Sequence, residues 1–180
     1  MANAQKVKEV ILSISAIIEE KKLFLTQLDA AIGDGDHGLN MAKGFGAAKE
    51  KLEAADFETP QDVLKAVGMA LISKVGGAAG PLYGTAFLNA GKAVAGKETL
   101  SLADFEAMVQ GALEGVKQRG KATKGEKTMV DAIEPALEAL REAIAKGAST
   151  REAMDEAVAA AEKGVAYTKT IAATKERACY

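Results

Sequence analysis

The chain has 180 residues, of which 48% are hydrophobic but only 4% aromatic, and it contains no Trp. This length is enough for one well-buried core, so residues 1–180 are expected to form a single domain of packed helices with an aliphatic core. With a formal net charge of −2 and both signs interspersed, the sequence lacks the basic footprint of a nucleic-acid-binding protein and any polybasic membrane-binding patch.

Apolar residues at three- and four-residue spacing predict a long first helix over residues 7–29. A glycine-rich acidic loop follows, and the same spacing predicts a second helix over residues 39–52. Thr59 and Pro60 are typical of a helix N-terminus, so a third helix is expected to open there and to stop at Gly76.

Capping residues and glycine stops predict four further helices, which begin at Pro81, Ser101, Thr128 and near Ser149. The fourth is expected to run to about Gly96, and the fifth to Gly120. Pro135 lies inside the sixth, where it removes one backbone hydrogen bond and should kink the helix. No segment alternates with a period of two, so we expect seven helices and no sheet.

The cellular compartment follows from two simple features. The single cysteine, Cys179, excludes an internal disulfide and fits a reducing environment. No apolar stretch approaches the length of a membrane span, and the apolar run that ends at Ile18 continues directly into charged residues. We therefore expect a cytoplasmic protein with no membrane partner.

The loop after the first helix concentrates charge and flexibility within residues 29–40. It contains three carboxylates, three glycines and the only histidine of the chain, which are Asp29, Asp34, Asp36, Gly33, Gly35, Gly38 and His37. Like charges this close repel one another, so the loop is strained unless a cation neutralises it. Mg²⁺ fits, because it shares its oxygen ligands between a few carboxylates and substrate phosphates.

Other interpretations of this loop are weaker. A helix-loop-helix Ca²⁺ site needs a Glu at its twelfth position, but counting from Asp29 gives Asn40 and counting from Asp34 gives Phe45. The three glycines also satisfy the dinucleotide-binding pattern GxGxxG, but a predicted helix precedes them where that pattern requires a strand. A capped, solvated loop between two helices remains the structural alternative.

A second glycine-rich stretch, residues 76–84, places bare backbone directly before a predicted helix. Free amides and the positive end of the helix form an anion site there without Lys or Arg. The two loops could thus clamp a di- or triphosphate, although a tight turn between helices is the alternative for this stretch. The lysine-rich connection 120–127 is either a solvated turn or part of the nucleotide or partner surface.

Taken together, five segments resemble the DhaL family, the nucleotide-binding subunits of phosphotransferase-system-dependent dihydroxyacetone kinases. The segments are residues 28–38, 73–77, 80–84, 125–131 and 173–178. The resemblance covers nearly the whole chain and implies an all-α, eight-helix, up-and-down barrel-like bundle that binds its nucleotide at one end. Family members continue beyond the position of Tyr180 through a loop and a final helix, so the last helix is expected to be absent from this sequence.

The resemblance also implies roles for individual residues. The Mg²⁺ ligands would be Asp29, Asp34 and Asp36. The nucleotide would contact His37, Asn40, Gly77, Ala78 and Ala79 through its phosphates, Thr128 and Met129 through its nucleoside, and Arg177 from the last interhelical turn. Ala79 departs from the family, which usually has Ser there, so one hydrogen bond to phosphate is lost. No residue of this chain is assigned as a nucleophile or general base.

The activity implied by the resemblance is a relay that depends on partner subunits. ADP would stay bound with Mg²⁺, a DhaM-like phosphohistidine carrier would convert it to ATP, and the phosphoryl group would pass to dihydroxyacetone held by a DhaK-like subunit. Positioning and charge neutralisation are the main demands of phosphoryl transfer, and the two loops can meet them. Two alternatives remain: the equivalent domain of an ATP-dependent glycerone or acyl kinase, and a nucleotide-dependent regulatory subunit that engages a transcriptional regulator.

Overall fold

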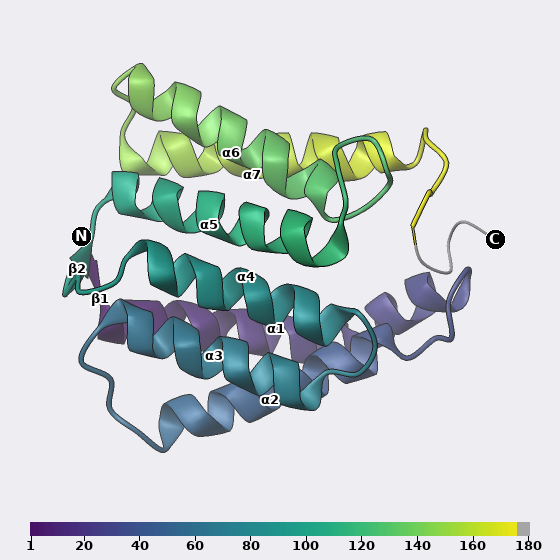
Figure 1. Cartoon of the computed structure of the whole chain (residues 1–180), viewed down its shortest axis with the longest axis horizontal. Coiled ribbons are helices and arrows are strands. Elements are labelled where there is room, and N and C mark those ends of the chain that lie inside the picture. The colour runs from purple at the N-terminus through teal and green to yellow at the C-terminus, as the bar shows by residue number, and fades with distance from the viewer. Residues whose placement is uncertain (176–180) are drawn as a thin grey trace.

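The computed structural model describes residues 1–175 and is an up-and-down bundle of helices (Figure 1). Its elements in chain order are β1 (Ala2–Asn3), α1 (Ala4–Ala30), α2 (His37–Glu53), α3 (Pro60–Lys74), α4 (Ala79–Ala93), β2 (Thr99–Leu100), α5 (Leu102–Gly120), α6 (Val130–Ala145) and α7 (Thr150–Thr168). The seven helices within this part of the chain confirm the expected all-α class. No helix among the described residues is long and apolar enough to cross a membrane.

Helix starts follow the local capping signals. The Thr59 side chain accepts a hydrogen bond from the backbone N–H of Asp62, and Pro60 occupies the first turn of α3. A reciprocal capping box joins Ser101 to Asp104 at the start of α5, and an equivalent box opens α7. Each box satisfies backbone donors that the first helical turn would otherwise leave unpaired.

Three expectations about the elements need correction. The fourth helix begins at Ala79 instead of Pro81, and the sixth begins at Val130, with Met129 instead of Thr128 at its N-cap position. The expectation of no sheet is wrong in detail, because β1 and β2 form an antiparallel pair of two residues each, with Ala2 opposite Leu100. A strand of two residues is too short to show periodicity, and its pairing partner lies almost a hundred residues away.

The core lies where consecutive helices pack against one another. Its larger part is formed mainly by aliphatic side chains and Phe45 from the first four helices, and smaller clusters continue through α5, α6 and α7. Helices α6 and α7 approach closely at Gly164, where a Cβ would overlap the backbone oxygen of Asp131. Pro135 lies four residues after Asp131 and has no N–H to offer that oxygen, so the helical hydrogen bond is missing at this crossing.

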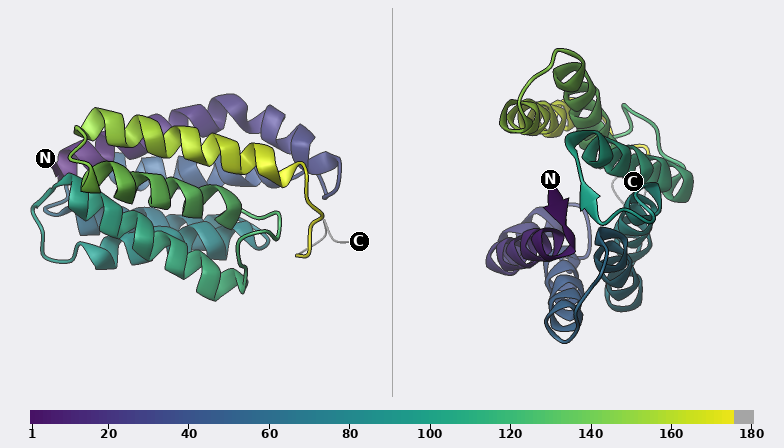
Figure 2. Two further views of the ribbon diagram at one scale, coloured as in Figure 1. Left: turned by 90° about the horizontal axis from the view of Figure 1, so that it is seen from above. Right: turned by 90° about the vertical axis from the view of Figure 1, so that its left-hand side faces the viewer.

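The up-and-down order brings alternate connections to the same end of the bundle. The loops α1–α2, α3–α4 and α5–α6 lie at the right-hand end in Figure 1, together with the chain that leaves α7. The view from above in Figure 2 shows the same grouping. Both glycine-rich stretches, residues 29–40 and 76–84, therefore meet at one end of the molecule, although 35 residues separate them in sequence.

Candidate phosphate and metal site

Asp29, at the end of α1, organises the loop that follows it. One oxygen of its carboxylate, Oδ2, accepts hydrogen bonds from the backbone N–H groups of Asp36 (3.0 Å) and His37 (3.2 Å). Asp36 occupies the N-cap position of α2, but its side chain makes no capping hydrogen bond. The carboxylate of Asp29, which belongs to α1, accepts the backbone hydrogen bonds at the start of α2 instead. The far end of the loop is thus held against Asp29, at the end of α1 where the loop begins.

The folded loop gathers its three carboxylates. One oxygen each from Asp29, Asp34 and Asp36 lies within 4.8 Å of the others. Two ligands on opposite sides of a Mg²⁺ ion, each at about 2.1 Å, would lie roughly 4.2 Å apart, so small side-chain movements would allow all three to coordinate one ion. Negative charge and oxygen-only ligands also favour a hard cation at this position.

Two glycines make this close approach of the carboxylates possible. A Cβ on Gly33 would overlap Oδ1 of Asp29, so any other residue would push that carboxylate away. Gly35 adopts φ +70°, a left-handed conformation that other residues rarely accept. The missing Cβ of Gly33 and the left-handed backbone of Gly35 are both needed beside the acidic side chains. This explains why glycines and acidic residues alternate in the sequence.

The second glycine-rich stretch presents the bare start of α4. Ala78 is its N-cap residue and makes no side-chain cap, and Gly77 adopts φ +64° just before it. Gly80 is required for close packing, because a Cβ there would overlap the carbonyl oxygen of Val75. The first backbone N–H groups of a helix have no intrahelical partner, so they can bind an anion here.

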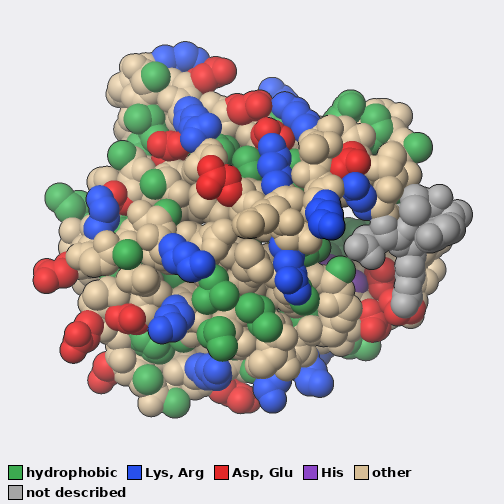
Figure 3. Space-filling view, viewed as in Figure 1, with side chains coloured by type: hydrophobic (Ala, Val, Ile, Leu, Met, Phe, Trp, Pro, Cys, Tyr) green, Lys and Arg blue, Asp and Glu red, His purple; other side chains and the backbone are tan. Residues whose placement is uncertain are grey.

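The two loops face each other across a cavity of about 530 Å³. Its lining comprises Asp29, Ile32, Gly33, Asp34, Asp36, His37, Asn40, Gly76, Gly77, Ala78 and Ala79. Asn40, in the first turn of α2, lies beside the second loop, since its side-chain nitrogen would be 3.5 Å from a Cβ on Gly76. In the space-filling view, acidic side chains gather beside the histidine at the end of the molecule that carries these loops (Figure 3).

Eight of the eleven residues expected at the site therefore line this one cavity. The sequence did not single out Ile32, Gly33 or Gly76 as contact residues, although all three belong to the motifs that it identified. A larger cavity of about 610 Å³ lies elsewhere, mainly among apolar side chains such as Val10, Phe87 and Met154. That second cavity offers no cluster of charged groups that could bind phosphate or metal.

Thr128 and Met129 lie outside the lining of the polar cavity, in the turn that leads into α6 at the same end of the bundle. The hydroxyl of Thr128 accepts from the N–H of Val130, and its own N–H donates to Asp131. Their contact with a nucleoside stays a prediction. Arg177 lies outside the described residues.

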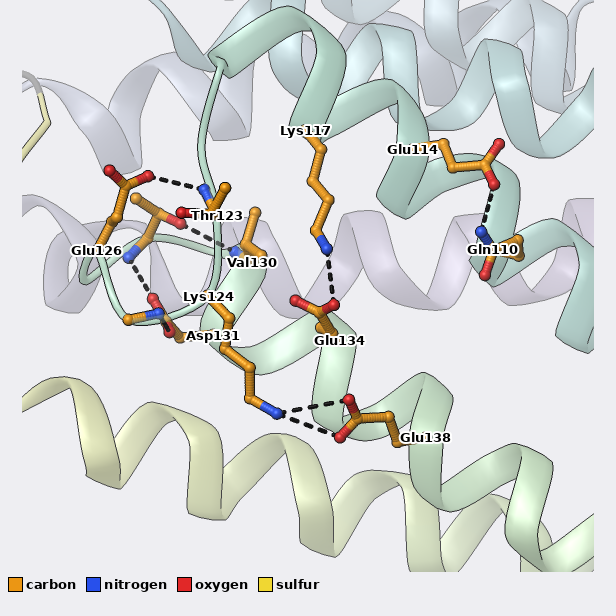
Figure 4. A network of polar contacts seen from close by, with 12 residues as sticks. Gln110, Glu114, Lys117, Thr123, Lys124, Glu126, Val130, Asp131, Glu134 and Glu138 are labelled. Atoms are coloured by element: carbon orange, nitrogen blue, oxygen red, sulfur yellow. Dashed lines mark hydrogen bonds and ion pairs between the residues drawn. The ribbon is translucent and has the colours of Figure 1, made fainter.

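Sequence reasoning missed two carboxylates that shape this turn. Asp131 is only 1% exposed and accepts hydrogen bonds from the N–H groups of Gly125 (2.5 Å) and Thr128 (2.9 Å). The backbone N–H of Thr123 holds the pKa of Glu126 below its usual value, and Lys175 and the Thr174 hydroxyl lower it further. Figure 4 shows both carboxylates directed into the turn. Both carboxylates lie in the segment 125–131 that resembles the family, and Asp131 also stands in an expected first helical turn, but neither was assigned a role from the sequence.

The comparisons with known proteins agree with this architecture. A family model described as the DAK2 domain matches residues 31–180. The chain is 44% identical over 163 residues to the ADP-binding subunit DhaL of PEP-dependent dihydroxyacetone kinase 1 from Listeria innocua, covering 91% of this chain and 76% of the relative. It is 42% identical to the ADP-binding subunit DhaL of the PEP-dependent dihydroxyacetone kinase of Escherichia coli, covering 91% and 78%.

Among solved structures, the chain is similar to the dihydroxyacetone kinase from C. freundii in complex with AMP-PNP and Mg²⁺. The TM-score is 0.67 with 26% sequence identity, and the match covers 91% of this chain but only 29% of that kinase chain. The fold of the whole bundle thus corresponds to part of a larger protein. Because the family model covers most of the sequence and the two DhaL relatives align over nine-tenths of it, this chain belongs to the DAK2 domain family.

Proposed function

We propose that this protein is the nucleotide-binding subunit of a dihydroxyacetone kinase and holds ADP or ATP together with Mg²⁺. One observation carries the proposal: three clustered carboxylates and the uncapped start of α4 line a single polar cavity. The names of the DhaL relatives, which are ADP-binding subunits, and the AMP-PNP and Mg²⁺ complex of the similar kinase support the same conclusion.

The two sides of the cavity would divide the work. Asp29, Asp34 and Asp36 would hold Mg²⁺, which when bound neutralises phosphate charge. The backbone N–H groups at Gly77, Ala78 and Ala79 would donate hydrogen bonds to phosphate oxygens, and the positive end of α4 adds a favourable field. His37 and Asn40 lie between these groups and would complete the phosphate contacts.

Catalysis in this proposal consists of positioning and charge stabilisation, because phosphoryl transfer asks for little covalent chemistry from the protein. The acceptor would bind to a DhaK-like subunit, and a DhaM-like phosphocarrier would recharge the bound ADP. The protein would act in the cytoplasm, where both partners would be available. Two alternative functions are compared with this relay: an ATP-dependent kinase domain and a nucleotide-sensing regulatory subunit.

Isothermal titration of ADP into the purified chain tests the central claim. We expect binding in the presence of Mg²⁺ and a loss of affinity of at least tenfold when EDTA replaces the metal. Equal affinity with and without Mg²⁺ would contradict the metal site, and absence of binding would contradict the function. Retention of ADP through gel filtration would support the relay, whereas rapid exchange with added nucleotide would support an ATP-dependent kinase.

A further inference from the structure

The turn between α5 and α6 contains a lysine in an unusual backbone conformation. Lys127 adopts φ +59°, in the left-handed region that non-glycine residues rarely occupy, and Gly125 nearby adopts φ +93°. Such a conformation costs free energy and persists only where surrounding contacts fix it. The contacts of Lys127 therefore indicate what the turn is built to hold.

The side chain of Lys127 reaches the end of α7. Its Nζ donates to the backbone oxygens of Thr168 (2.6 Å) and Ile171 (3.3 Å). Thr168 is the last residue of α7, a helix with no basic residue in its own last turn. The C-terminal carbonyl groups of a helix carry partial negative charge, so an ammonium group from another element stabilises them.

Neighbouring contacts fasten the turn on both sides. Glu126 accepts from the Thr123 N–H (2.7 Å), and it pairs with the Thr174 hydroxyl (3.2 Å) and with Lys175 (3.3 Å) beyond α7. On the inner side, buried Asp131 accepts from two N–H groups of the same turn (Figure 4). The turn is thus held between the core of α6 and the chain that leaves α7.

We propose that Lys127 is a positioning residue for the nucleoside side of the site. By joining the end of α7 to the turn, it fixes the backbone that carries Thr128 and Met129 and does not itself bind phosphate. This proposal rests on the proposed function and on the nucleoside contacts predicted for Thr128 and Met129. A lysine beside a nucleotide site would ordinarily be assigned to phosphate, but here two carbonyl oxygens already engage its Nζ.

The test compares two ligands and two variants. Lys127→Met removes the ammonium group and keeps most of the side-chain length. Lys124→Met removes a charge from the same turn, where Nζ makes only an exposed ion pair with Glu138 (3.2 Å), and serves as the matched control. Titration calorimetry with ADP and with pyrophosphate, each with Mg²⁺, separates nucleoside contacts from phosphate contacts.

We expect Lys127→Met to weaken ADP binding by about tenfold or more, because the backbone of Thr128 and Met129 would no longer be held in place, and to leave pyrophosphate affinity within about twofold. Lys124→Met should change neither affinity. Backbone amides of residues 168–175 should exchange hydrogen faster in Lys127→Met than in Lys124→Met.

Other results would overturn the proposal. If Lys127→Met lowered the affinity for ADP and for pyrophosphate equally, Lys127 would be assigned as a phosphate ligand. If neither affinity changed, Lys127 would have no role at the site. If the wild-type chain binds neither ligand, the proposed function fails first and independently of Lys127.

Discussion

At the scale of single residues, the three aspartates of the acidic loop differ in what their removal would test. Asp29 both faces the cavity and holds the loop through two backbone N–H groups, so its replacement would disturb the fold of the loop as well as a metal site. The Asp34 and Asp36 side chains are exposed, and Asp36 meets Asp29 through its backbone N–H, which a substitution by Asn keeps. They are the cleaner positions at which to measure metal binding.

We predict that Asp34→Asn and Asp36→Asn each weaken binding of Mg-ADP by a few kcal/mol, roughly a hundredfold in Kd, because each removes a charged ligand. Titration calorimetry measures the loss. Thermal stability without ligand should be unchanged or slightly higher, since repulsion between carboxylates decreases. Asp56→Asn, at an exposed position in the α2–α3 connection, is the control. Unchanged affinity in both site variants would exclude the metal assignment.

Ala79 offers a change in the opposite direction. We predict that Ala79→Ser tightens nucleotide binding by about 0.5–3 kcal/mol, because a hydroxyl at the first residue of α4 can donate a charge-assisted hydrogen bond to phosphate. The Kd for Mg-ADP measures the gain, and Ala54→Ser at the exposed end of α2 controls for the substitution itself. A Kd that does not fall would show that the α4 start does not face phosphate.

At the scale of elements, the start of α5 gives a pH-dependent stability. A hydrogen bond from Lys97, followed by those from the N–H and hydroxyl of Ser101, lowers the pKa of Asp104 from 3.8 to about 2. A carboxylate whose pKa is lower in the folded state stabilises the fold above its unfolded pKa, and this stabilisation is lost as pH falls. The relevant window therefore runs from about pH 4 to about pH 2.

Thermal melts between pH 2 and pH 5 test this prediction. The wild-type Tm should fall more steeply through that window than the Tm of Asp104→Asn, whose side chain does not titrate. Proton NMR titration of the Asp104 carboxyl group should give a pKa near the stated value. If the Tm of both proteins fell in parallel with pH, the Asp104 cap at the start of α5 would not contribute to the pH dependence of stability.

Replacing a glycine inside a helix by alanine usually raises the free energy of unfolding, but we expect the opposite where α6 and α7 cross. Gly164→Ala would place a Cβ against the backbone oxygen of Asp131, so we predict a loss of about 1–3 kcal/mol in unfolding free energy. Gly46→Ala in α2 meets no atom within 4 Å and should gain about 0.5–1 kcal/mol. Urea unfolding of both variants gives the comparison, and a stabilised Gly164→Ala would mean that the two helices are not this close.

At the scale of the whole molecule, the proposed function makes the bundle one half of a reaction site. The polar cavity lies at the end where three loops and the chain after α7 meet. A phosphoryl group held between the acidic loop and the start of α4 would have to reach an acceptor that approaches this end. Proximity lowers a reaction barrier by several kcal/mol only when both reactants are held in line.

We predict that the purified chain with Mg-ATP and dihydroxyacetone forms no detectable dihydroxyacetone phosphate, whereas addition of a DhaK-like subunit restores transfer. A coupled assay for the sugar phosphate measures this outcome. The Asp34→Asn variant with the same partner should remain inactive, which controls for activity of the partner itself. Steady turnover by the chain alone would instead assign a self-sufficient kinase.

The sequence alone determined those features that depend on neighbouring residues. Helical spacing and capping residues predicted all seven helices of the described part of the chain, because helix hydrogen bonds and caps connect residues three or four positions apart. The acidic and glycine-rich motifs likewise identified both loops that line the polar cavity. Each motif is contained within about a dozen residues, so the kinds of ligand that it can bind follow from its composition alone.

Only the tertiary structure decided which distant groups meet. No periodic pattern or motif indicates the β1–β2 pairing, the burial of the Asp131 carboxylate, the close approach of Gly164 to α6 or the contact of Lys127 with the end of α7. Lys127 is one of several lysines in a connection for which the sequence left two interpretations, a solvated turn or part of the nucleotide or partner surface. In the structure its Nζ caps a helix end forty-one residues away. Such contacts depend on how the helices pack, and a local pattern in the chain does not specify that packing.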